Sequence, residues 1–194
     1  DCRAALGAAP MAVLTRRLAI DDRFTAVHCT HTAAEDLREF ERAGGNVCIC
    51  PCTEGNLGDG LFEHLGVCGG RVCLGTDCNA RIDMIEEMRW LEYGQRTRKL
   101  HRGVMSAASG TEDVSASLLR CATVHGARAL GVAAGAIEAG KWADFAVVDL
   151  SKPSLAGWHA ESLLPSVLFG CSAEAIICAT CVGGHWHGLR DVDE

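Results

Sequence analysis

Apolar and polar positions in the N-terminal part of the chain follow the order expected for a strand, a helix and a second strand. Residues 24–29 form a short run of β-forming side chains, and residues 46–50 form another. Between them, Thr32 and Glu35 have the Thr-x-x-Glu spacing of a capping box, and a Gly-Gly pair at 44–45 ends the predicted helix. Two such strands in one sheet must run parallel, so the pattern predicts a βαβ unit.

The pattern repeats with looser spacing further along the chain. Residues 51–60 are rich in Gly, Asn and Asp and are interpreted as a loop, and residues 61–65 are expected to form a helical turn. A third strand is predicted over 71–75, followed by a long helix that Asp83 caps and that runs to about residue 101. This part of the chain is therefore predicted to be a parallel α/β fold.

The periodicity changes near residue 131, where short apolar runs and turn signals replace the helical spacing. The elements expected around and after this point are a helix over 114–130, a strand over 145–150, a helix over 162–168, a strand over 176–182 and a hairpin that turns at Gly183 and Gly184 into 185–187. We therefore divide the chain into a parallel α/β domain, residues 1–131, and a small β-rich domain, residues 132–194.

The composition excludes several classes of protein. The chain has 194 residues, is 48% hydrophobic and carries a formal net charge of −7, so binding to nucleic acid through its phosphates is not expected. No apolar run reaches the roughly 18 residues that a membrane span needs. We expect a cytoplasmic protein with no nucleic-acid or membrane partner. Its 12 cysteines lie mostly in apolar runs and are interpreted as reduced core residues, although a thiol-based redox or metal-storage protein remains a third hypothesis.

The candidate chemistry lies where the predicted parallel strands end. His28 closes the first strand, residues 51–60 follow the second, and Asp77 follows the third. The carboxyl ends of parallel strands meet at one edge of a sheet, which is where sites form in such folds. A neutral imidazole and a carboxylate at one edge can serve as metal ligand, general base and electrophile. Each residue alone is more often structural, so the prediction depends on their order and placement together.

Three segments carry a recognisable pattern: VHCTH at 27–31, PCTEGNLGDG at 51–60 and GTDCN at 75–79. They resemble the last three barrel strands, strands six to eight, of the amidohydrolase superfamily, and the likeness continues through 86–96 and 135–144. The resemblance covers nearly the whole chain. It implies the C-terminal part of a metal-dependent-hydrolase TIM (β/α)8 barrel, followed by strands of a small β-sandwich domain.

The resemblance also implies roles for individual residues. Asp77 is expected to ligate Zn²⁺, or another divalent metal, and to take a proton from the attacking water, while His28 hydrogen-bonds the attacking oxygen or the tetrahedral centre. Thr53 and Asn56 are expected to contribute to binding a small-molecule substrate. Cys78 stands where the family pattern has Ser, and Arg81 adds charge to the same loop, so both put the fit of the substrate in question.

The segments TEGNLGDG at 53–60 and RWLEYGQR at 89–96 resemble formimidoylglutamate deiminases in particular. Such enzymes hydrolyse N-formimidoyl-L-glutamate to N-formyl-L-glutamate and ammonia in histidine degradation. The first alternative is a guanine-deaminase-like enzyme or another deaminase of the superfamily. The second alternative is a catalytically dead, truncated α/β module.

The chain begins at Asp1 without an initiator Met, and the family's other zinc-binding histidines have no matching positions. We therefore expect a fragment that is inactive by itself and that aggregates or forms a homodimer through open strand edges. His185-x-His187 has a metal-motif spelling, but an exposed hairpin is favoured there. The row Cys48, Cys50 and Cys52 lacks the Cys-x-x-Cys spacing of a zinc site, so core packing is favoured.

Overall fold

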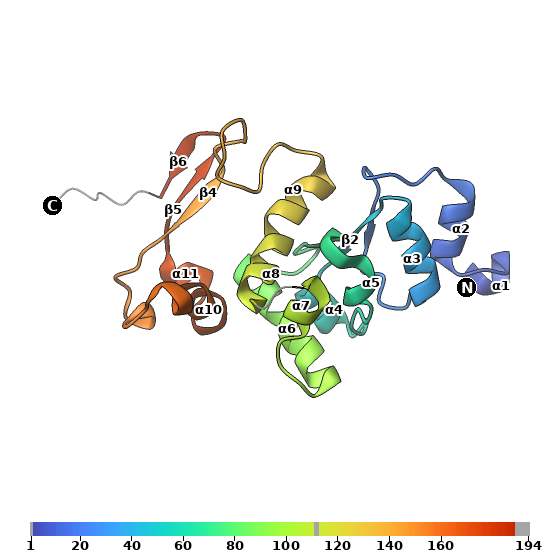
Figure 1. The fold of residues 1–194 in the computed structure, drawn as a ribbon, viewed down its shortest axis with the longest axis horizontal. Coiled ribbons are helices and arrows are strands. Elements are labelled where there is room, and N and C mark those ends of the chain that lie inside the picture. The colour runs from blue at the N-terminus through green and yellow to red at the C-terminus, as the bar shows by residue number, and fades with distance from the viewer. Residues whose placement is uncertain (1, 111–112, 189–194) are drawn as a thin grey trace.

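The computed structural model describes residues 2–110 and 113–188 and contains two three-stranded sheets (Figure 1). The first sheet is parallel, in the order β1-β2-β3, and its strands are β1 (Thr25–Val27), β2 (Asn46–Ile49) and β3 (Val72–Leu74). The second is antiparallel, in the order β4-β5-β6, and its strands are β4 (Phe145–Val148), β5 (Ile177–Val182) and β6 (His185–His187). The predicted mixed α/β class is confirmed.

Helices pack on the first sheet and link it to the second. Their bounds are α1 (Cys2–Leu6), α2 (Pro10–Arg17), α3 (Ala34–Arg42), α4 (Pro51–Leu57), α5 (Leu65–Cys68), α6 (Met84–Lys99), α7 (Val104–Ser109), α8 (Val114–Ala122), α9 (Val124–Leu130), α10 (Ala160–Gly170) and α11 (Ala173–Ile176), with 3-10 turns over Gly69–Arg71 and Pro153–Leu155. Helices α6, α8 and α9 contact β3 directly. No helix in the described part of the chain is long and apolar enough to cross a membrane.

The predicted capping box at Thr32 is wrong. Helix α3 begins at Ala34, its N-cap residue is Ala33, and no side chain caps it. Thr32 instead belongs to the turn after β1, because its backbone N–H donates to the Cys29 carbonyl at 3.1 Å. The N-cap of the helix therefore lies one residue later than predicted. The predicted end at Gly44 is confirmed, because this residue has a left-handed φ of 102°.

The segment 51–60, expected to be a loop, contains helix α4. Pro51 occupies the first helical turn, where its fixed φ suits a helix and its missing N–H costs nothing. The helix ends at Gly58, which is left-handed with φ 74°. The predicted helical turn over 61–65 is also displaced, because α5 starts only at Leu65.

The helix expected over 114–130 is interrupted at Thr123. This residue has φ −119° and ψ −87°, which ends α8 and starts α9. The Thr123 hydroxyl donates to the Leu119 carbonyl at 2.7 Å, a bond that competes with the helical ladder. By contrast, the predicted cap of α6 is confirmed, because the Asp83 carboxylate accepts from the N–H groups of Ile85 and Glu86 at 2.9 and 3.1 Å.

Helix α7 was not predicted, and a distant carboxylate caps it. Glu92, on α6, is fully buried. Its oxygens accept from the backbone N–H groups of Gly103, Val104 and Met105 at 3.1, 3.2 and 2.9 Å, and from Arg96 at 2.8 Å. The start of α7 is thus stabilised by a residue eleven or more positions earlier, which local pattern does not reveal.

The second sheet has the predicted hairpin. Gly183 and Gly184 have φ values of 57° and 84°, as a two-residue turn requires, and they pair Val182 with His185. His185 and His187 are exposed. Helix α10 packs against α6 and α8, so residues after 131 share a core with residues before it. The division into two domains at residue 131 stays a prediction.

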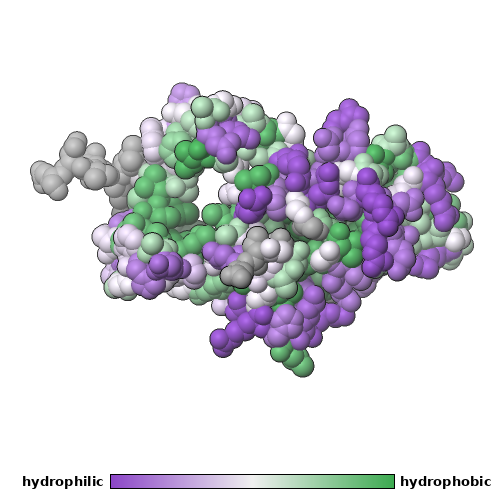
Figure 2. All heavy atoms as spheres, in the orientation of Figure 1, coloured by the Kyte–Doolittle hydropathy of each residue, from purple (hydrophilic) through white to green (hydrophobic). Residues whose placement is uncertain are grey.

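The cysteines divide by position. None of the described cysteines is in a disulfide, and Cys50, Cys68, Cys73, Cys121, Cys171 and Cys181 are buried. Cys78 and Cys178 are exposed, so the interpretation of all these thiols as core residues is wrong at those two positions. Figure 2 shows hydrophilic side chains over α3 and more apolar surface nearer the second sheet.

Substitution of Gly45 tests how tightly the residues around α3 are packed. A Cβ at this position would overlap the ring of Phe40, which is fully buried, so the ring or the backbone would have to shift. We expect Gly45→Ala to lower the free energy of unfolding by about 1–3 kcal/mol. Gly66→Ala is the matched control, because nothing lies within 4 Å of its added Cβ. Urea denaturation followed by circular dichroism measures both, and equal stability of the two variants would contradict this packing.

Substitution of Glu92 tests whether α7 depends on the cap that this distant carboxylate provides. Glu92→Gln places an amide where backbone N–H groups need acceptors, and we expect a loss of about 3 kcal/mol in the free energy of unfolding. Glu35→Gln serves as control, because Glu35 forms only an exposed ion pair with Arg38. We expect that substitution to change stability by less than about 1 kcal/mol. Chemical denaturation is the measurement, and a small effect at Glu92 would show that α7 does not depend on it.

Candidate active site

The first sheet brings two of the predicted site residues together. His28 follows β1 directly, and Asp77 lies in the loop after β3, with β2 between the two strands. The His28 Nε2 and Asp77 Oδ2 atoms are 3.7 Å apart. Both side chains are about one-third exposed, at 35% and 38%, so a small molecule can reach them. Their catalytic roles stay predictions.

The backbone at these positions is strained. His28, Cys29 and Asp77 have φ values of 67°, 54° and 46°, in the left-handed region that non-glycine residues avoid. Each such residue costs on the order of 1–3 kcal/mol, and the surrounding structure must hold it in place. The His28 N–H donates to the Cys48 carbonyl at 2.8 Å, which extends the β1–β2 ladder by one bond beyond the strand. The backbone therefore leaves the extended conformation of a strand at both His28 and Asp77.

The residues predicted to bind substrate lie on α4. Thr53 is buried, and its hydroxyl donates to the carbonyl of Thr76 at 3.0 Å, which ties α4 to the loop that carries Asp77. Asn56 is exposed on the last turn of the helix. The hydroxyl proton of Thr53 is thus engaged within the protein. Substrate binding by Thr53 and Asn56 stays a prediction.

Sequence reasoning missed a third side chain, Glu54, which is only 1% exposed. Its Oε1 accepts from the Cys50 N–H at 2.9 Å and lies 3.1 Å from the Nδ1 of His28. Burial raises the pKa of Glu54, and the hydrogen bonds from Cys50 and His28 oppose that rise. The sequence did contain a signal for this residue. Pro51 is typical of the first turn of a helix, and a helix that begins there would have placed Glu54 on one of its faces.

A second buried carboxylate accepts a hydrogen bond from the backbone at the start of α4. Glu87, on α6, is fully buried, and its Oε2 accepts from the Cys52 N–H at 2.9 Å. Burial raises the pKa of Glu87, while hydrogen bonds from Cys52 and Asn79 lower it. Glu87 therefore holds the backbone at the start of α4, the helix that carries Glu54.

Three thiols lie on the sheet near this site. Cys48 and Cys73 are opposite each other on β2 and β3, and Cys50 follows two residues after Cys48. A Cβ on Gly75 would lie 3.1 and 3.3 Å from the sulfurs of Cys48 and Cys50, which explains why glycine occupies that position. A hydrogen bond with Cys50 lowers the pKa of Cys48, but the hydrogen bond with Cys73 and burial together outweigh it and raise the pKa to about 12. A protonated thiol is a poor metal ligand.

The described residues do not form a complete metal site. Within residues 2–110 and 113–188, no group of three or more His, Cys, Asp or Glu side chains is placed to hold a metal ion. Asp77 offers one partly exposed carboxylate, which suits a single ligand of a divalent cation. The described residues therefore fit one ligand position and not a three-ligand zinc centre.

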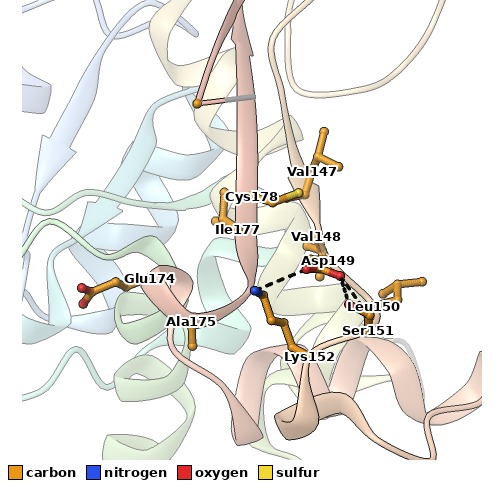
Figure 3. Close-up of a pocket in the computed structure, with 11 residues that line it drawn as sticks. Val147, Val148, Asp149, Leu150, Ser151, Lys152, Glu174, Ala175, Ile177 and Cys178 are labelled. Carbon is orange, nitrogen blue, oxygen red and sulfur yellow. Dashed lines mark hydrogen bonds and ion pairs between the residues drawn. The ribbon is translucent and has the colours of Figure 1, made fainter. Parts of the chain in front are cut away.

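A large cavity lies elsewhere in the molecule. It measures about 900 Å³ and is formed by β4, β5, α11 and the segment after β4 (Figure 3). Its charged groups include Lys152 and Asp149, which are 3.4 Å apart and pair with each other. None of the four predicted site residues lines it. The cavity and the His28–Asp77 pair are thus separate features.

Comparison with known proteins gives relatives for nearly the whole chain. It is 34% identical over 188 residues to the formimidoylglutamate deiminase of Pseudomonas aeruginosa, an alignment that covers 96% of this chain and 41% of that protein. It is also 34% identical over 168 residues to a 5-methylthioadenosine/S-adenosylhomocysteine deaminase of Pyrococcus abyssi, covering 84% of this chain and 37% of the relative. The chain therefore spans about two-fifths of the length of these relatives.

The fold agrees with these relatives. An adenosine deaminase from Xanthomonas campestris, solved with bound zinc, matches 100% of this chain and 44% of its own length, with a TM-score of 0.82 and 26% sequence identity. The pattern of the Amidohydrolase family matches residues 2–186. The resemblance seen in the sequence is confirmed, and the chain belongs to the amidohydrolase family.

Proposed function

We propose that this chain is part of an enzyme that hydrolyses N-formimidoyl-L-glutamate to N-formyl-L-glutamate and ammonia, a step of histidine degradation. The observation that carries the proposal is the meeting of His28 and Asp77 at the carboxyl ends of parallel strands, with Nε2 and Oδ2 3.7 Å apart. Support for this substrate comes from the 34% identity to the Pseudomonas deiminase over 96% of the chain.

In this proposal the two side chains have different tasks. Asp77 accepts a proton from the attacking water and returns it to the departing nitrogen, which leaves as ammonia. His28 hydrogen-bonds the attacking oxygen. Thr53 and Asn56 are proposed to contribute to the substrate pocket, Asn56 through its exposed amide and Thr53 through the loop contact it makes.

A divalent metal, with zinc as the first choice, is proposed as the cofactor of the whole protein. Asp77 is proposed as one of its ligands, because its carboxylate is partly exposed at the strand edge. The other ligands are proposed to come from the part of the protein that corresponds to the unmatched length of the relatives. A divalent cation at such a site acidifies water and so supplies a nucleophile at neutral pH.

The proposal extends to the architecture. Strands β1, β2 and β3 are taken as three of the eight strands of a (β/α)8 barrel, and the second sheet as part of a small β-sandwich domain. The support is the TM-score of 0.82 with the Xanthomonas enzyme, of which this chain spans 44%. An unfinished barrel leaves two strand edges unpaired, so activity is assigned to the whole protein.

A deaminase of purine compounds is the second candidate. The Pyrococcus enzyme named for 5-methylthioadenosine and S-adenosylhomocysteine has the same 34% identity as the Pseudomonas deiminase, although over a shorter stretch. The His28–Asp77 pair serves either reaction, because both replace a C–N bond by a C–O bond. The side chains that touch the rest of the substrate decide between them.

The choice of substrate is tested with the whole gene product. We expect ammonia release from N-formimidoyl-L-glutamate with a kcat/KM at least about 100-fold above that for guanine, adenosine or 5-methylthioadenosine. The measurement is a coupled ammonia assay across this panel. Preference for a purine compound would replace the proposed substrate with the second candidate. No ammonia from any compound would favour a catalytically dead module.

Asp77 is tested in the same protein. Asp77→Asn removes the carboxylate proposed to bind metal and transfer the proton, so we expect kcat/KM to fall on the order of 10²- to 10⁴-fold and bound metal to decrease. Asp22→Asn is the matched control, because Asp22 is exposed and precedes β1 at the opposite end of the strand. Steady-state kinetics and elemental analysis give both readings. Unchanged metal content and rate in Asp77→Asn would contradict the assignment.

A further inference from the structure

The contact between Glu54 and His28 determines more than the position of the imidazole ring. The Oε1 of Glu54 already accepts the Cys50 N–H at 2.9 Å, and it lies 3.1 Å from the Nδ1 of His28. Because Oε1 already accepts a backbone N–H, it is the acceptor oxygen of the carboxyl group, and an oxygen that carries no proton can only accept hydrogen bonds. The proton in the contact with His28 therefore belongs to Nδ1. In a neutral ring that leaves the other nitrogen, Nε2, without a proton and with a free lone pair.

The geometry on the other side of the ring agrees with this protonation. Nε2 of His28 lies 3.7 Å from Oδ2 of Asp77, which is longer than a hydrogen bond. Two acceptors at this separation do not bond to each other. A molecule that donates two hydrogen bonds, such as water, suits a position beside both atoms, within hydrogen-bond distance of each.

The surroundings hold the ring from two directions. The His28 backbone is left-handed, with φ 67°, and its N–H is bonded to the Cys48 carbonyl at 2.8 Å. The ring is held by Glu54, which itself is 1% exposed and is anchored to the backbone of Cys50 at the start of α4. Glu54 therefore has little freedom to leave its position, and rotation of the ring would break its bond to a buried carboxylate.

We propose that Glu54 is a positioning residue that holds His28 as the Nδ1–H tautomer and presents Nε2 as a hydrogen-bond acceptor toward Asp77. Its consequence for catalysis rests on the proposed function. In the proposed reaction, Nε2 of His28 then accepts a hydrogen bond from the attacking water, whose proton goes to Asp77. Glu54 keeps the ring in the orientation that this hydrogen bond requires, as an acidic partner does for a catalytic histidine.

The tautomer can be read directly in the whole protein by nitrogen NMR after labelling histidine with ¹⁵N. The His28 signals are assigned by their loss in His28→Asn. We expect them to show a protonated Nδ1 and an unprotonated Nε2 whenever the ring is neutral. His125 is an internal reference, because its Nδ1 lies 2.9 Å from the Val72 carbonyl, which can only accept. A neutral His28 protonated at Nε2 would overturn the proposal.

Two substitutions separate position from charge. Glu54→Gln keeps an acceptor oxygen, so we expect it to retain the Nδ1–H tautomer. Glu54→Met fills the space without an acceptor, so we expect the proton to move to Nε2 in a large share of the molecules. The His125 signals should be unchanged in both variants. If Glu54→Met keeps the Nδ1–H tautomer of His28 in full, Glu54 does not hold the ring and the proposal fails.

The kinetics add a reading that a purely structural role would not produce. We expect Glu54→Met to lower kcat about 10- to 100-fold with little change in KM, and Glu54→Gln to restore part of the loss. Glu39→Met, on the exposed face of α3, is the control and should leave both constants unchanged. Equal loss in Glu54→Gln and Glu54→Met would contradict a role through the tautomer.

The proposal about Glu54 and the proposed function can be contradicted separately by these measurements. The NMR experiment needs no substrate, so a protein that shows the Nδ1–H tautomer but releases no ammonia from formimidoylglutamate would overturn only the proposed substrate. A protein that is an active deiminase with His28 protonated at Nε2 would overturn only the role of Glu54.

Discussion

Parallel pairing of β1, β2 and β3 is the constraint on which the rest of this structure depends. Parallel neighbours cannot be joined by a tight turn, so each needs a connection across the face of the sheet. Helix α3 provides the first connection, and α4 and α5 provide the second. The same pairing places every carboxyl end at one edge. His28, the start of α4 and Asp77 meet there although they are far apart in the chain.

Buried carboxylates hold the ends of the helices around this sheet. Glu54 and Glu87 accept backbone N–H groups at the start of α4, and Glu92 accepts those at the start of α7. The first N–H groups of a helix have no partner inside it, and a buried one without a bond costs about 1–3 kcal/mol. Each carboxylate is expensive to bury, and its hydrogen bonds offset that cost. In Glu54 this structural use coincides with a contact to the candidate catalytic histidine.

The second sheet is joined to the first through helices rather than through strands. Helix α10 packs on α6 and α8, and Arg89 of α6 donates to the Leu168 carbonyl at 2.8 Å and to the carbonyl of Cys171. A cation at the C-terminal end of a helix satisfies carbonyls that have no partner within it. The core accordingly continues from Leu37 on α3 to Leu168 on α10. The large cavity lies beyond this contact, on the β4–β5 side.

The sequence by itself determined the strands, the parallel α/β class, the cap at Asp83 and the hairpin at Gly183, because each depends on neighbours only a few residues apart. It also placed His28 and Asp77 at strand ends. It could not determine the break at Thr123, the cap of α7 by Glu92 or the contact of Glu54 with His28, because these depend on residues brought together by folding. Glu54 lies 26 positions from His28, and only the packing of α4 against the β1 edge makes them partners. Local patterns encode which elements form, whereas buried polar contacts between elements exist only once the tertiary structure has removed water from them.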